Sequence, residues 1–104
     1  MSLELTPGTR LFGAACTSEF VVVKAAGGAV DIRIGGHPAL TSADDRDATL
    51  SVTTDAESKP LMGKRYVDAD ETIELLCTKP GDGAPAIGDD VLVQKDAKAL
   101  PASD

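Results

Sequence analysis

Length, composition and charge already exclude several classes of function. The chain has 104 residues, of which 17 are acidic and 10 are basic, so its formal net charge is −7. Because affinity for nucleic acids rests largely on Lys and Arg side chains that neutralise phosphates, we expect no nucleic-acid partner. No run approaches the roughly 20 apolar residues of a membrane-spanning helix, so we expect no membrane insertion.

The length predicts a single small domain, residues 1–104, with frayed ends at 1–8 and 97–104. Apolar residues make up 42% of the chain, but it has only two Phe, one Tyr and no Trp. This composition predicts a thin, mainly aliphatic core that would gain from self-association. Two cysteines are too few for a disulfide framework, and residues 1–10 lack the features of a secretory signal. We therefore expect a cytoplasmic protein.

The first half of the chain is predicted to contain three extended segments. Residues 10–12 follow a turn at Pro7–Gly8. Residues 18–24 (SEFVVVK) give the clearest strand, because the β-branched run is too short for a helix and glycines follow it. Residues 30–34 alternate apolar and polar side chains with period two. We expect 18–24 and 30–34 to pair as a hairpin that turns at Gly27–Gly28.

The second half shows the same short extended segments between polar connections. Residues 39–47 are predicted to be a solvated loop, and the alternation over 48–53 predicts a strand. Residues 64–67 and 72–79 are predicted to form a hairpin, in which alternate side chains of the second strand share one face. Residues 90–95 (DVLVQK) supply a last strand.

Together these segments predict the fold class. No stretch of ten residues carries a helical apolar stripe, whereas six or seven short strands are separated by turn signals. Such a pattern is typical of an all-β protein with mainly antiparallel strands, either a small sandwich or a partly open barrel.

The sequence favours a protein without a catalytic site. It contains no Walker loop, nucleophile elbow, H-E-x-x-H pair or dinucleotide-binding fingerprint. With one histidine in the chain, any Ser-His or Cys-His pair must use His37. Neither Cys16 nor Cys77 lies in a recognisable nucleophile context, so we name no catalytic or cofactor-binding residue.

Cys16, His37 and Cys77 are the only thiol and imidazole groups, and they define an alternative metal site. A structural zinc site uses four ligands, with cysteines paired as C-x-x-C, and neither cysteine has such a neighbour. A zinc or iron site with three protein ligands remains the alternative. The simpler interpretation is that Cys77 packs as a small hydrophobic residue and His37 is a polar turn residue.

Acidic residues gather at two predicted turns, Asp68–Glu71 and Asp89–Asp90. If the two turns lay close together, their carboxylates could bind calcium, which takes six to eight oxygen ligands. No loop with a defined glycine turn accompanies them, so ordinary solvation of hairpin tips is the simpler interpretation.

Residues 12–40 resemble the desulforedoxin-like rubredoxin knuckle, with Phe12 at its aromatic position and Cys16 as the second cysteine of its first C-x-x-C pair. A β-branched strand, a glycine turn and a return strand follow, as in that family. Gly13 replaces the first cysteine, and the closing segment around Gly35 has no thiol. The resemblance therefore implies a β-scaffold without the family's tetrathiolate iron or zinc site, in a module that often forms homodimers.

These observations favour a non-catalytic interaction or accessory module, either a homodimer or a small subunit of a larger complex. Its partner would be another protein or a second copy of the chain. An apolar strand with a free edge can pair with a partner's strand. The candidate residues for such a contact are Phe20, Val21, Val22 and Val23, unless this run is an interior strand of the sheet.

Overall fold

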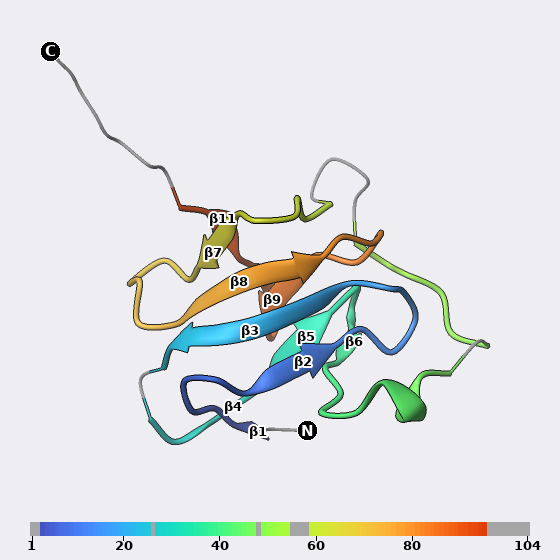
Figure 1. Cartoon of the computed structure of the whole chain (residues 1–104), viewed down its shortest axis with the longest axis horizontal. Coiled ribbons are helices and arrows are strands. Elements are labelled where there is room, and N and C mark those ends of the chain that lie inside the picture. The colour runs from blue at the N-terminus through green and yellow to red at the C-terminus, as the bar shows by residue number, and fades with distance from the viewer. Residues whose placement is uncertain (1–2, 26, 48, 55–58, 96–104) are drawn as a thin grey trace, which may run out of the picture.

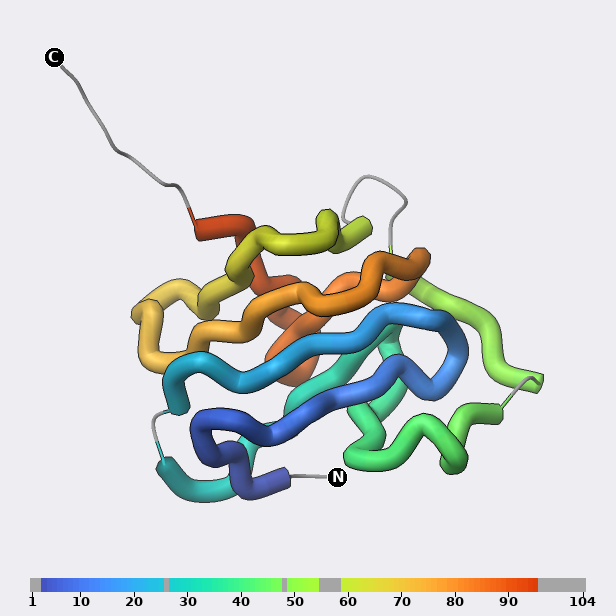
Figure 2. The backbone as a smooth tube through the Cα atoms, viewed as in Figure 1, coloured from blue at the N-terminus to red at the C-terminus, as the bar shows by residue number. Residues whose placement is uncertain are grey.

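The computed structural model describes residues 3–25, 27–47, 49–54 and 59–95 and is built of short antiparallel strands (Figures 1 and 2). No helix within these ranges is long and apolar enough to cross a membrane. The described elements are β1 (Leu3–Glu4), β2 (Arg10–Phe12), β3 (Glu19–Lys24), β4 (Ala29–Val30), β5 (Ile32–Ile34), β6 (His37–Pro38), the 3-10 helix η1 (Ala43–Asp45), β7 (Arg65–Val67), β8 (Glu74–Lys79), β9 (Pro85–Ile87), β10 (Asp90–Val91) and β11 (Val93–Gln94).

Two main sheets lie in layers, and this arrangement confirms the predicted all-β class. The five-stranded sheet has the order β11-β7-β8-β3-β2, and the four-stranded sheet has the order β10-β9-β5-β6. Figure 1 shows β8, β3 and β2 in front, with β9, β5 and β6 behind them. The strands β1 and β4 form a separate small pair. Because each main sheet ends in edge strands, the fold is a sandwich and not a closed barrel.

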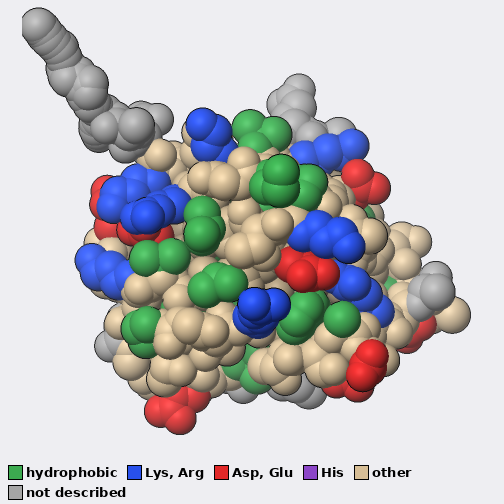
Figure 3. All heavy atoms as spheres, in the orientation of Figure 1, with side chains coloured by type: hydrophobic (Ala, Val, Ile, Leu, Met, Phe, Trp, Pro, Cys, Tyr) green, Lys and Arg blue, Asp and Glu red, His purple; other side chains and the backbone are tan. Residues whose placement is uncertain are grey.

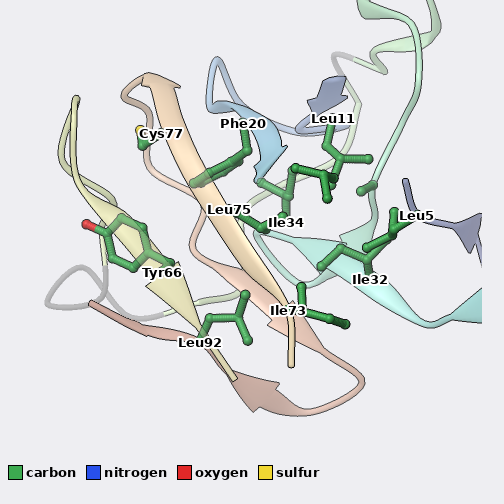
Figure 4. Close-up of a cluster of buried hydrophobic side chains, with 12 residues drawn as sticks. Leu5, Leu11, Phe20, Ile32, Ile34, Tyr66, Ile73, Leu75, Cys77 and Leu92 are labelled. Atoms are coloured by element: carbon green, nitrogen blue, oxygen red, sulfur yellow. The ribbon is translucent and has the colours of Figure 1, made fainter. Parts of the chain in front are cut away.

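The core lies between the two sheets and is mainly aliphatic. Phe20 and Leu75 of the front sheet are fully buried, as are Ile32 and Ile34 of the rear sheet. Figure 4 shows these side chains directed toward one another. Phe20 also meets Tyr66 edge to face, with ring centroids 6.3 Å apart, so two of the few aromatic rings stabilise each other.

The predicted pairing of 18–24 with 30–34 is wrong. Strand β3 pairs with β2 on one side and with β8 on the other, whereas β5 pairs with β6 and β9 in the opposite sheet. Gly27 and Gly28 both have positive φ, as expected for a turn. The chain leaves this turn through β4, which pairs with β1. Both apolar strands bury one face, so placing them on opposite sides of the core buries more surface than a flat hairpin would.

The predicted hairpin of 64–67 and 72–79 is confirmed as β7 paired with β8. Its turn is held by Asp68, whose carboxylate accepts hydrogen bonds from the Thr72 backbone N–H at 2.7 Å, the Thr72 hydroxyl at 2.6 Å and the Ile73 N–H at 3.1 Å. Leu75 and Cys77 lie on the inward face, as the alternation predicted. Burial would raise the pKa of Asp68, but these hydrogen bonds outweigh it and leave the pKa lowered.

The strand predicted at 48–53 does not form in the described part of that range, 49–53. This segment instead crosses one end of the rear sheet, where the Thr53 N–H donates to the Gly35 carbonyl at 2.9 Å. Leu50 and Val52 are only half-buried. A segment that alternates apolar and hydroxyl side chains can also cover the end of a sheet without backbone pairing. The alternation over 48–53 therefore does not by itself require a strand.

Residues 90–95 form two short strands where one was predicted. β10 pairs with β9 at the end of the rear sheet, and β11 pairs with β7 at the end of the front sheet. Leu92 lies between them and is buried. One segment therefore provides the last strand of both sheets.

Candidate functional site

Two of the three soft ligands considered for a metal site, Cys77 and His37, have other partners. The Cys77 thiol is buried on β8 and donates to the Lys79 carbonyl at 3.4 Å, and burial raises the pKa of Cys77. A buried thiol with a raised pKa is a poor nucleophile at neutral pH. His37 Nε2 lies 2.6 Å from the Ser51 carbonyl oxygen, a contact that ties the 49–54 segment to β6.

Cys16 is half-buried in a tight setting of glycines. A Cβ atom on Gly13 would collide with the Cys16 sulfur, and a Cβ on Gly83 would lie 2.7 Å from it. Across the described ranges, no group of three or more His, Cys, Asp or Glu side chains is placed to hold one metal ion. The site of Cys16, His37 and Cys77 is therefore not assembled, and the resemblance to a rubredoxin knuckle stays a prediction.

The run Phe20–Val23 lies on an interior strand, as the alternative interpretation required. Phe20 and Val22 are 0% and 1% exposed and point into the core, so they cannot contact a partner. Both edges of β3 are already hydrogen-bonded to neighbouring strands. Only Val21 and Val23, half-buried on the outer face, remain of the predicted interaction residues.

Val21 belongs to a cross-strand row on the outer face of the front sheet. It lies opposite Leu76 on one side and Arg10 on the other, and Leu76 lies opposite Arg65. Figure 3 shows this face, where hydrophobic side chains lie among many Lys and Arg side chains. The aliphatic stems of such basic side chains cover apolar neighbours while their charges stay in water.

The large hydrophobic side chains that are most exposed lie elsewhere, at the β10–β11 end of the sheets. Val91 and Val93 on this segment are 41% and 61% exposed. Leu61 and Met62, just before β7, are 54% and 66% exposed. We call these four residues the apolar edge; they are Leu61, Met62, Val91 and Val93. Large hydrophobic side chains exposed along a sheet edge are candidates for an interaction site.

Leu61 and Met62 extend the edge that β11 begins. The Leu61 N–H donates to the Tyr66 hydroxyl at 2.8 Å, and Tyr66 lies opposite Gln94 of β11. The Gly63 N–H donates to the Cys77 carbonyl, so this segment continues the ladder of β7 along β8. Residues 61–64 thus follow the sheet beyond the last pair of β11.

Each strand of the β10–β11 segment has backbone hydrogen-bonding groups that face away from its neighbouring strand. The Leu92 N–H donates to Pro85 of β9, and the Lys95 N–H donates to Arg65 of β7. In an antiparallel ladder, bonded and non-bonded pairs alternate along a strand. Val91 is the non-bonded position opposite β9, and Gln94 is the non-bonded position opposite β7. The N–H and C=O groups of Val91 therefore point away from β9, and those of Gln94 point away from β7.

A groove of about 530 Å³ lies beside this segment. It is bounded by the β7–β8 turn and the β9–β10 turn, which the sequence had suggested as an acidic pair. Its walls carry Asp68, Asp70, Asp89 and Asp90, and its apolar lining includes Val91 and Val93. The two acidic turns do lie close together, but their carboxylates are not grouped around a point that could hold a metal ion.

A second hollow, of about 430 Å³, lies on the other side of β10 and shares Asp89 and Val91 with the groove. Its Arg33 is engaged by Asp31, at 3.1 Å. That ion pair lowers the pKa of Asp31 through the Arg33 hydrogen bond and raises the pKa of Arg33. The residues of β10 therefore form a ridge between two depressions.

Glu74 holds the end of the β10–β11 segment on the front sheet. Its buried carboxylate accepts hydrogen bonds from Arg65 Nη1 and Lys95 Nζ, both at 3.0 Å. Burial would raise the pKa of Glu74, but the hydrogen bonds from Lys95 and Arg65 leave it lowered. The Lys95 side chain thus contacts Glu74 of β8 directly and anchors the end of this segment to the front sheet.

No family model, curated protein or solved structure matches this chain. The apolar edge and the groove beside it are therefore the candidate functional site, and sequence reasoning did not single out the apolar edge. A signal was present: in DVLVQK, Val91 and Val93 alternate with Leu92, so one pair of side chains must face away from the core.

Proposed function

We propose that this chain is a non-catalytic interaction module that binds a protein partner through the apolar edge. The observation that carries the proposal is the strong exposure of Leu61, Met62, Val91 and Val93, which lie on β10, on β11 and on the segment that leads into β7. These are all the large hydrophobic side chains that are strongly exposed in the described residues. An interface would bury them and complete the sheet ends, as an accessory subunit or a dimer does.

The proposed compartment is the cytoplasm. Both cysteines are free, and neither is part of a disulfide. Free thiols in a chain of this size fit a reducing compartment, whereas small secreted domains commonly rely on disulfides.

The test compares the wild-type chain with a Met62→Lys/Val93→Lys double variant. Both substitutions place charge on the apolar edge without touching the core. The matched control is Ala29→Lys/Thr41→Lys, which adds the same charge at exposed positions far from the edge in the sheet order. Quantitative affinity enrichment from cells would identify partners, and native mass spectrometry would report oligomeric state and metal content.

We expect the edge variant to lose a specific partner, or a dimer, that the control retains. Identical enriched proteins for all three chains, together with a monomeric mass throughout, would contradict the proposal. Zinc or iron bound in a whole-number ratio would favour the metal-binding alternative instead.

A further inference from the structure

We propose that the groove beside β10 and β11 binds an extended segment of another protein in which Lys or Arg alternates with apolar residues. This inference rests on the proposed function, and it adds the chemistry of the partner. The segment would lie along Asp90–Val93, between the two acidic turns.

The backbone supplies the first part of the argument. Val91 is a non-bonded position in the β9–β10 ladder, so its N–H and C=O groups point away from β9, while the Leu92 N–H donates to Pro85 of β9. Open backbone groups at a sheet edge pair most readily with another extended chain. Each sheet offers a short ladder only, so side-chain contacts must supply much of the affinity and all of the selectivity.

The side chains define which extended chain would fit. Val91 and Val93 are two residues apart and both exposed, so they offer apolar contacts at the spacing of alternate residues in a strand. Of the groove's four carboxylates, that of Asp68 is already occupied by hydrogen bonds from its own turn. The side chains of Asp70, Asp89 and Asp90 are left to attract a ligand.

The distribution of these carboxylates favours several separated positive charges over a single ion. No three of the acidic side chains in the described ranges are grouped to hold one metal ion. Carboxylates spread along the walls of a groove instead match cationic side chains that project at intervals from a peptide. Such electrostatic complementarity mainly sets selectivity and the rate of association.

Charge also decides between another protein and a second copy of this chain. Two copies whose grooves faced each other would bring the Asp70, Asp89 and Asp90 carboxylates of one copy toward those of the other. Like charges placed opposite each other are unfavourable. A basic segment removes this repulsion, and the chain's net charge of −7 attracts it from a distance.

The experiment uses the full chain and a fluorescein-labelled peptide, Lys-Val-Lys-Val-Lys-Val-Lys, in fluorescence anisotropy. Two control peptides separate charge from shape: Glu-Val-Glu-Val-Glu-Val-Glu and Lys-Gly-Lys-Gly-Lys-Gly-Lys. We expect the Lys-Val peptide to bind at least ten-fold more tightly than either control. Equal binding of the Lys-Gly peptide would overturn the inference, because it would show attraction by net charge alone.

Matched variants locate the binding. Asp89→Lys/Asp90→Lys should weaken binding of the Lys-Val peptide at least ten-fold. Asp44→Lys/Asp45→Lys makes the same charge change at η1, away from the groove, and should weaken binding less than three-fold. Equal losses for the two double variants would overturn the inference.

A second readout separates this inference from the proposed function. In NMR titrations, the amide signals of Asp90 and Val91, which line the groove, should shift with added Lys-Val peptide, and those of β3 should not. If partners found in cells are lost with Met62→Lys/Val93→Lys but kept with Asp89→Lys/Asp90→Lys, the interaction module stands and the basic segment is wrong. A peptide-independent dimer that buries Val91 would likewise overturn the basic segment and leave the module.

Discussion

Two short apolar runs of this chain, Val21–Val23 in β3 and Val91–Val93 across β10 and β11, have similar residues and opposite environments. In each run the central side chain points into the core: Val22 is 1% exposed and Leu92 is 5% exposed. The outer side chains differ. Those of β3 are half-buried on a sheet face, whereas Val91 and Val93 are 41% and 61% exposed at a sheet end.

The difference comes from the order of strands in the sheets and not from the local sequence. β3 has a neighbour on each side, so its backbone groups are paired and its outer valines are shielded by cross-strand neighbours. β10 and β11 each end a sheet, and each is hydrogen-bonded to one neighbouring strand only. An apolar run is available to a partner only where the topology leaves it at an edge.

The largest expected effect is at the centre of β3. Phe20→Ala removes a fully buried ring that meets Tyr66, and we expect it to lower the free energy of unfolding by about 3–5 kcal/mol. Urea unfolding followed by tyrosine fluorescence or circular dichroism would measure this loss. A loss below about 1 kcal/mol would show that β3 is not the centre of the core.

A matched pair of valines tests the comparison directly. Val22→Ala should lower the free energy of unfolding by about 2 kcal/mol, because a buried side chain loses two methyl groups and leaves a cavity. Val93→Ala makes the same chemical change at an exposed site and should stay within about 0.5 kcal/mol of wild type. Similar losses for both variants in urea unfolding would contradict the assignment of Val93 to an open edge.

Glu74 offers a smaller perturbation, at the attachment of the edge segment. Glu74→Gln keeps the shape but removes the charge that Arg65 and Lys95 share, and we expect a loss of about 1 kcal/mol. Both basic side chains are exposed by more than a third, so solvent reduces the contribution of each pair. Hydrogen exchange of the Lys95 amide should also become faster in this variant. Exchange of the β3 amides should change only by the amount that the loss in the global free energy of unfolding predicts.

The same carboxylate predicts a pH dependence. Its pKa is lowered in the folded protein, so its contribution is fully present above its ordinary value of 4.5 and is lost as the pH falls through the folded pKa. The stability difference between wild type and Glu74→Gln should therefore be constant near neutral pH and shrink below about pH 4.5. A difference that grows on acidification would mean that Glu74 is not stabilised by its two basic partners.

Sequence patterns predicted the class of the fold and its most local part. Period-two alternation was sufficient for the β7–β8 hairpin, because its two strands are joined by a short turn that Asp68 fixes locally. The same reasoning failed for residues 18–24 and 30–34. Which sheet each of these strands joins depends on the packing of the whole core and not on the turn between them. The reasoning also missed β9, which begins at Pro85, because a proline is tolerated at the first position of a strand but obscures the pattern.

The candidate site was predictable only in part. The two acidic turns were recognised from composition, and their closeness was one of the alternatives considered. The apolar edge was not recognised, because only the strand order shows that β10 and β11 are terminal. Leu61 and Met62 follow a polar connection with no strand pattern, and their place beside β7 depends on hydrogen bonds to Tyr66 and Cys77.

The shared C-terminal strand segment has a kinetic consequence. Because residues 90–95 close both sheets, a fluctuation that lifts this segment breaks two ladders in one event. The amides of Leu92 and Lys95 belong to different sheets, yet their protection factors in hydrogen exchange should be similar and should fall together under mild denaturant. Opening of this one segment is the event that would uncover two unprotected sheet edges simultaneously.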